Sequence, residues 1–224
     1  MSRDLRYRCL ILDHDDTVIA STADIHYPAY LEIMRRLRPS LRPLTLDGWF
    51  LKNFEPGISA YLADELGLDK EELEAEYRIW REFTTRNQAS FFGGMTDFLI
   101  EYQGSGGKIS VISHSEKDLI LKDYRFCTGG RVKPDLVFGW EVEEQHRKPD
   151  PWPVEQTLER LGVGAKEALI VDDLKPAVLM ARATGVDIAA AGWGHNIPQI
   201  REFMEANTIA YLRTIDELRE LAGT

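Results

Sequence analysis

The residues best suited to chemistry in this chain lie where a short apolar run ends in acidic side chains. Cys9 to Leu12 are apolar, and the carboxylates of Asp13, Asp15 and Asp16 fall within the next four positions. Such a run is typical of a strand buried on both faces of a sheet, and ligands of open α/β sheets bind beyond the carboxyl ends of the strands. Residues two apart in extended backbone point the same way, so we expect Asp13 and Asp15 to face one site. Because two adjacent carboxylates repel, the pattern predicts a bound metal or a carboxyl that stays protonated.

The segment Asp13–Thr17 resembles motif one of the haloacid dehalogenase superfamily, which reads Asp-x-Asp-x-Thr after the first strand. Three later segments match the remaining motifs in the same order: a strand ending in Ser113, the segment Lys148-Pro149-Asp150-Pro151, and the acid pair Asp172-Asp173. Four motifs in order, each after a predicted strand, are far more specific than any one of them. The chain is most similar to the branch with a helical cap after motif one, which includes phosphoglycolate phosphatases and β-phosphoglucomutases.

This resemblance implies a magnesium-dependent phosphatase that hydrolyses a small phosphorylated metabolite through an aspartyl-phosphate intermediate. Asp13 would be the nucleophile, and Asp15 would protonate the leaving group and then deprotonate the attacking water. Ser113 and Lys148 would stabilise charge on the transferring phosphoryl group. The implied ligands of Mg²⁺ are oxygens of Asp13, Asp15, Asp172 and Asp173. Asp173 is the first choice for the principal metal ligand, and Asp15 would contribute its carbonyl.

Four further residues are candidates for binding the substrate. Thr17 would brace the acidic loop, and His114, which follows Ser113, would lie at the edge of the pocket. Lys52 and Asn53 belong to a predicted loop between helices, where they would meet a second anionic group or a hydroxyl of the substrate.

Hydrophobic periodicity predicts the elements that hold these residues. Residues 20–89 show only helical patterns, apart from an irregular stretch at 41–57, and include a capping box at Asp69 and Glu72. From residue 90 onward helices alternate with strands, which are expected near residues 108–113, 136–138, 168–171 and 188–191. This alternation predicts an α/β fold with a doubly wound parallel sheet, a Rossmann-like core, and a small all-helical cap inserted after the first strand. The predicted domains are residues 1–19 with 90–224 for the core and 20–89 for the cap.

Charge and hydropathy exclude several classes of protein. A formal net charge of -10 over 224 residues argues against binding to nucleic acid or to an anionic membrane surface. No apolar run approaches the roughly 20 residues of a membrane span, and the first residues lack the apolar core of a signal peptide, so we expect a cytoplasmic protein. Two cysteines predict neither a disulfide framework nor a zinc site. The expected partner is the phosphorylated metabolite alone, bound by a monomer or weak homodimer.

Other activities of the superfamily are alternatives to hydrolysis. A phosphomutase resembling β-phosphoglucomutase keeps all four motifs and differs in excluding water from the aspartyl-phosphate, which a sequence does not reveal. A catalytically silent protein that binds a phospho-ligand is a second alternative, although no motif acid is lost here. Asp15 argues against a dehalogenase, which lacks this acid. It also argues against a phosphonoacetaldehyde hydrolase, although Lys52 lies in the region of that enzyme's cap lysine.

Overall fold

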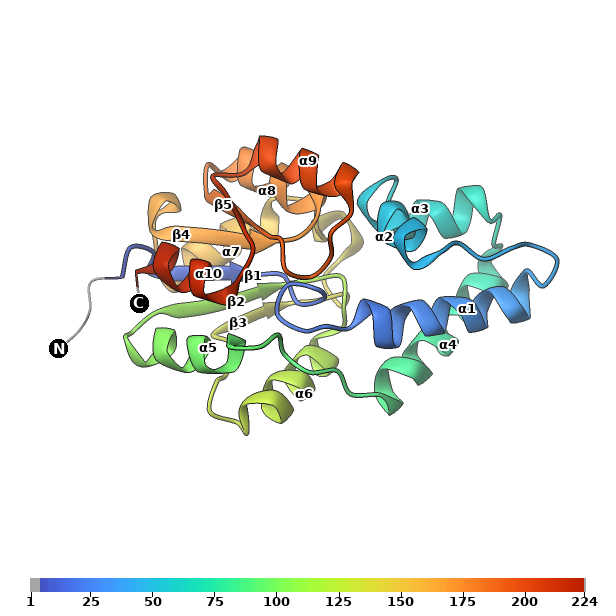
Figure 1. Cartoon of the computed structure of the whole chain (residues 1–224), viewed down its shortest axis with the longest axis horizontal. Coiled ribbons are helices and arrows are strands. Elements are labelled where there is room, and N and C mark those ends of the chain that lie inside the picture. The colour runs from blue at the N-terminus through green and yellow to red at the C-terminus, as the bar shows by residue number, and fades with distance from the viewer. Residues whose placement is uncertain (1–4, 224) are drawn as a thin grey trace. The chain divides into compact units, whose positions relative to one another are not determined.

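The computed structural model describes residues 5–223, and its contacts divide the chain into two compact units. The first, called the sheet unit below, contains the described residues up to Ala20 and from Ser90 onward. The second, called the helical unit, is Ser21–Ala89. Figure 1 labels most of the helices and strands of both units. Within the described residues, no helix combines the length and the apolar character needed to cross a bilayer.

A six-stranded parallel sheet forms the centre of the sheet unit, with the strand order β3-β2-β1-β4-β5-β6. The strands are β1 (Cys9–Leu12), β2 (Lys108–Ile112), β3 (Leu136–Phe138), β4 (Ala168–Asp172), β5 (Asp187–Ala191) and β6 (Ala210–Leu212). Leu12 at the end of β1 is paired with Val111 of β2 on one side and with Val171 of β4 on the other. The residues that follow these three strands therefore meet at one edge of the sheet. The predicted α/β fold with a doubly wound parallel sheet is confirmed.

Helices cover both faces of this sheet (Figure 1). They are α5 (Met95–Gly104), α6 (Lys117–Thr128), α7 (Trp152–Leu161), α8 (Lys175–Thr184), α9 (Pro198–Asn207) and α10 (Ile215–Ala222). Because both faces are covered, every residue of β1 is at most 1% exposed. Leu10 and Leu12 pack in one apolar cluster with Phe98 and Tyr102, and each such buried side chain contributes about 1.5–3 kcal/mol. The hydroxyl of Tyr102 also donates to the carbonyl of Tyr7, at 2.9 Å. The acidic loop thus begins from a fully buried strand.

The loop after β1 turns sharply and is tied to its own backbone. The amides of Val18 and Ile19 both donate to the carbonyl of His14, at 2.9 and 3.0 Å. Asp16 has a φ of 56°, a left-handed conformation that aspartate tolerates better than most residues. These contacts hold the loop compact, so the side chains of motif one are displayed from a fixed backbone.

The helical unit is built around aromatic side chains. Its elements are a π-helical turn (Thr22–His26), α1 (Tyr27–Leu37), α2 (Leu46–Phe54), α3 (Ile58–Ala60), a second π-helical turn (Tyr61–Glu65) and α4 (Lys70–Arg86). Tyr30 stacks on Trp49 with ring centroids 4.3 Å apart, and its hydroxyl lies 3.1 Å from that of Tyr61. The predicted capping box is present, since the Asp69 carboxylate accepts from the Glu72 amide while the Glu72 carboxylate accepts from the Asp69 amide.

The prediction of an irregular stretch at 41–57 is wrong, because residues 46–54 form α2. The side chain of Thr45 caps this helix by accepting from the amide of Gly48 at 3.2 Å. Gly48 suggested a break, but it lies in the first turn, where a Cβ atom would stand 3.3 Å from the Cβ of Leu44. Burial of Trp49 and Phe50, each 6% exposed, outweighs the low helix propensity of glycine.

Candidate active site

Three buried carboxylates meet where β1 and β4 end. Asp13 follows β1, Asp172 is the last residue of β4, and Asp173 comes directly after it. One oxygen from each lies within 4.8 Å of the others, and the residues are 7%, 1% and 3% exposed, respectively. The pairing of the two strands causes this approach, because the amide of Asp13 donates to the carbonyl of Val171 at 2.9 Å.

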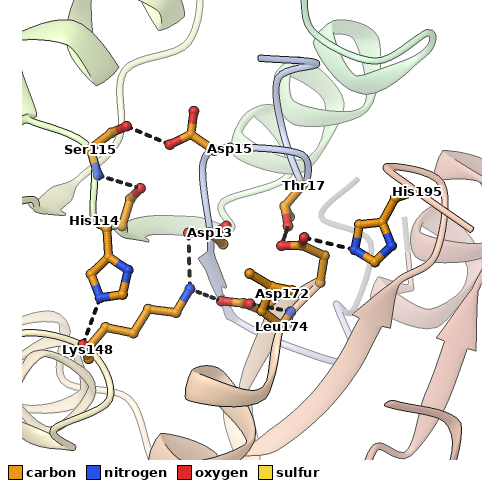
Figure 2. A network of polar contacts seen from close by, with 11 residues as sticks. Asp13, Asp15, Thr17, His114, Ser115, Lys148, Asp172, Leu174 and His195 are labelled. Carbon is orange, nitrogen blue, oxygen red and sulfur yellow. Dashed lines mark hydrogen bonds and ion pairs between the residues drawn. The ribbon is translucent and has the colours of Figure 1, made fainter. Parts of the chain in front are cut away.

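Lys148 brings a positive charge into this carboxylate cluster (Figure 2). Its Nζ lies 3.2 Å from Oδ1 of Asp13 and donates to Oδ2 of Asp172 at 2.5 Å. Burial alone would lower the pKa of Lys148, but the charges of Asp13 and Asp172 outweigh burial and hold that pKa above its usual range. Lys148 is therefore an ammonium ion at neutral pH, fixed beside the carboxylate of Asp13.

One ammonium does not balance three carboxylates. Burial raises the pKa of Asp13 well above its usual value; Lys148 opposes this, and the neighbouring acids Asp172 and Asp173 add to it. Burial likewise raises the pKa of Asp172 to about 6, against the opposing charge of Lys148. A cluster of carboxylate oxygens with excess negative charge is the donor set that hard divalent cations such as Mg²⁺ prefer. The residues present therefore fit the implied metal.

Asp173 and Asp172 differ in what already binds their oxygens. Both oxygens of Asp172 have donors, namely Lys148 at Oδ2 and the amide of Leu174 at Oδ1, 2.9 Å away. Oδ1 of Asp173 accepts from the hydroxyl of Thr17 at 3.3 Å, and Oδ2 lies 3.1 Å from Nε2 of His195. Neither of these partners of Asp173 is an ammonium group, so Asp173 is better suited than Asp172 to bind a metal ion.

Asp15 lies outside the carboxylate cluster and is held by motif two. Oδ2 of Asp15 accepts from the hydroxyl of Ser115 at 2.5 Å. The amide of Ser115 in turn donates to Oγ of Ser113 at 3.1 Å. Ser113 is 5% exposed and its amide donates to the carbonyl of Phe138, at 3.0 Å. The side chain of Asp15 is therefore connected through two serines to the end of β2.

His114 is exposed, but its ring is tied to the backbone of motif three. Nε2 of His114 lies 2.7 Å from the carbonyl oxygen of Lys148, so this nitrogen carries the proton and donates. Figure 2 shows the ring beside the backbone of Lys148, with the lysine side chain extending away from it toward Asp13. His114 joins motif two to motif three at this edge of the sheet.

Lys52 and Asn53 are not in a loop, contrary to the sequence analysis, but in the last turn of α2 within the helical unit. Nζ of Lys52 donates to both carboxylate oxygens of Glu65, at 2.7 and 2.6 Å. The side-chain amide of Asn53 donates to the carbonyl of Trp49 at 2.9 Å. Their part in substrate binding stays a prediction.

Three residues that contact the motif residues were not assigned a role from the sequence, namely Ser115, Trp193 and His195. Ser115 reaches Asp15, Trp193 donates from Nε1 to the carbonyl of Thr17 at 2.9 Å, and His195 reaches Asp173. All three follow the carboxyl ends of strands, β2 for the first and β5 for the others. That position is the only signal the sequence offers, and many loop residues share it.

A family model described as haloacid dehalogenase-like hydrolase matches residues 10–191, so the chain belongs to this family. A phosphoglycolate phosphatase from Aquifex aeolicus is 27% identical over 198 residues, which are 84% of this chain and 86% of that protein. A pyrophosphatase from Bacillus velezensis is 24% identical over 194 residues, 85% of each chain. These relatives and the family confirm the predicted superfamily and the prediction of a phosphatase enzyme.

The likeness extends to solved structures. A haloacid dehalogenase-like family hydrolase from Streptococcus pneumoniae superposes with a TM-score of 0.73 at 19% sequence identity, covering 96% of this chain and 98% of that one. At this identity the likeness shows the fold and leaves the substrate open.

Proposed function

We propose that this protein is a magnesium-dependent phosphatase that hydrolyses a small phosphorylated metabolite through an aspartyl-phosphate formed on Asp13. The observation that carries the proposal is the cluster of Asp13, Asp172 and Asp173 around the ammonium of Lys148 at the carboxyl edge of the sheet. A carboxylate that attacks phosphorus is repelled by the negative charge of the phosphate, and nearby cations offset this repulsion. Lys148 is one such cation, and the carboxylate cluster would bind another.

Asp13 is the proposed nucleophile. One of its oxygens attacks phosphorus, the bond from phosphorus to the leaving oxygen breaks, and the phosphoryl group becomes bound to Asp13. Lys148, 3.2 Å from Oδ1, keeps the carboxylate oriented and neutralises part of the charge on the phosphoryl oxygens. Asp13, Asp173 and the carbonyl of Asp15 would hold Mg²⁺, which supplies further positive charge against the phosphoryl group when bound.

Asp15 is the proposed acid and base. It gives its proton to the leaving oxygen in the first step, and in the second it takes a proton from the water that attacks the aspartyl-phosphate. That attack releases inorganic phosphate and restores the carboxylate of Asp13. The hydroxyl of Ser115, 2.5 Å from Oδ2 of Asp15, fixes the carboxyl group for both transfers. Ser113 would donate to a phosphoryl oxygen, and Thr17 and His114 keep the loops on either side in place.

The test is release of inorganic phosphate from phosphoglycolate, pyrophosphate, sugar phosphates and nucleotides, with and without Mg²⁺. Asp13→Asn is the matched blank, because it keeps the shape of the side chain and removes its charge. We expect release that requires Mg²⁺ and is lost in Asp13→Asn, with circular dichroism unchanged. Turnover by Asp13→Asn would refute the nucleophile. Interconversion of hexose phosphate isomers without phosphate release would instead identify a phosphomutase.

A further inference from the structure

The loop after β5 contacts both acidic loops of the sheet unit. Nε1 of Trp193 donates to the carbonyl of Thr17 in the motif-one loop, at 2.9 Å. Two residues later, Nε2 of His195 lies 3.1 Å from Oδ2 of Asp173. The side chains of His195 and Asp173 are 7% and 3% exposed. Residues 193–195 therefore connect motif one to motif four from a part of the chain that no motif covers.

Gly194 allows the approach between these loops. A Cβ atom at this position would stand 2.1 Å from the carbonyl oxygen of Asp16, far inside van der Waals contact. Any side chain here would push the loop away from motif one. Close backbone contact of this kind is a reason for glycine that is independent of turn geometry.

In the hydrogen bond between His195 and Asp173, the donor and the acceptor can be assigned. An ionised carboxylate only accepts hydrogen bonds, so Nε2 of His195 carries the proton and donates. On the other oxygen, Oδ1, the hydroxyl of Thr17 donates at 3.3 Å. Each oxygen of Asp173 is thus held by a donor from a different loop. In Figure 2 the side chain of His195 lies on the opposite side of the site from Lys148.

We propose that His195 is a positioning residue that orients Asp173 for binding a divalent cation, within a segment, residues 193–195, that locks motif four to motif one. This inference rests on the proposed function, because it takes Asp173 as a metal ligand. A hydrogen bond from outside the ligand set fixes the rotation of a ligating carboxylate, and loss of such a partner lowers metal affinity by about 10–100-fold. His195 thereby acts through Asp173 and does not touch the substrate.

The experiment measures Mn²⁺ binding to the full chain by electron paramagnetic resonance, with no substrate present. His195→Gln and His195→Asn form the matched pair, because the amide nitrogen of glutamine reaches the position of Nε2 and that of asparagine falls short of it. We expect His195→Asn to raise the dissociation constant for Mn²⁺ by about 10–100-fold. His195→Gln should stay within about threefold of the wild type. Thermal unfolding without metal checks that both variants are folded.

Two further variants separate the possible outcomes. Asp173→Asn removes a ligand charge and should weaken Mn²⁺ binding more than His195→Asn does. Ser115→Ala loses the contact with Asp15 and should leave Mn²⁺ affinity within about twofold of the wild type while lowering kcat. Failure of the wild type to bind Mn²⁺ would overturn the metal site of the proposed function. Tight binding by the wild type with equal affinities in the asparagine and glutamine variants would overturn the role of His195 alone.

Discussion

The metal-free protein is expected to lose stability as the pH rises from 5 to 7, and Mg²⁺ should reverse that loss. The carboxyls of Asp13 and Asp172 have pKa values raised above 3.8, their usual value, by burial in the first place. Between the unfolded and folded pKa values, the native state then binds more protons than the unfolded state, so the free energy of unfolding falls with rising pH. For Asp172, a rise from 3.8 to about 6 corresponds to about 3 kcal/mol over the whole pH range, of which about 1 kcal/mol is lost between pH 5 and pH 7.

Other groups with shifted pKa values also make the free energy of unfolding depend on pH. Glu32 and Glu72 have pKa values lowered to about 2 by hydrogen bonds from arginine side chains, so the stability they contribute is lost only as the pH falls below about 4.5. Glu76 is different, because burial raises its pKa to about 7 and its effect has the same sign as that of the carboxylate cluster. The pKa of His114 is lowered to about 4 by the surrounding protein and by the charge of Lys148, so His114 makes the free energy of unfolding rise with pH between about 4 and 6.5. The experiment is therefore made in a Glu76→Gln, His114→Gln background, which removes both contributions and leaves the cluster.

The assay is thermal unfolding at pH 5, 6 and 7, in a chelator and in excess Mg²⁺. For a chain of this size each kcal/mol shifts Tm by about 2–4 °C, so the loss of about 1 kcal/mol from Asp172 corresponds to a fall of about 2–4 °C in the chelator, to which Asp13 adds. Mg²⁺ must displace protons to bind, so the increase in Tm that it causes should be larger at pH 7 than at pH 5. A metal-free Tm that stays level or rises from pH 5 to pH 7 would refute this account of the cluster.

Two substitutions test the roles of Lys148 and Lys52. Lys148→Met leaves buried carboxylates without their ammonium and should lower the free energy of unfolding by about 3–5 kcal/mol in urea titrations with a chelator; equal stability of variant and wild type would contradict the ion pairs seen here. Lys52→Ala should raise the Michaelis constant for the phosphorylated substrate, whereas Glu65→Ala, which breaks the same ion pair and keeps the lysine, should not. An unchanged constant in Lys52→Ala would remove Lys52 from the substrate site.

Most strands of the sheet could be predicted because they are apolar runs between charged residues. Residues 168–171 and 108–113 stand out in this way, and covering both faces of the sheet demands such runs. Strand β6 was missed because Ala210–Leu212 contains alanine and tyrosine and is a weaker apolar run than Leu136–Phe138 of β3, which is equally short and lies at the other edge of the sheet. Helix α2 was missed because Gly48 was weighed by its helix propensity, whereas packing of Trp49 decides that segment.

The contrast between local sequence patterns and packing of distant segments also explains which site residues could be found from the sequence. Asp13 and Asp173 are visible in the sequence because each lies in a motif whose spacing reflects one strand and the turn after it. Lys148 is visible because it opens the segment Lys148-Pro149-Asp150-Pro151. His195 shares no ligand spacing with another histidine in the sequence, and its contact with Asp173 depends on the pairing of β4 with β5. A side chain that acts on a neighbouring loop leaves no periodicity in its own segment, so only the assembled sheet reveals it. Further residues that shape this site should therefore be sought by substituting residues at the strand ends outside the four motifs.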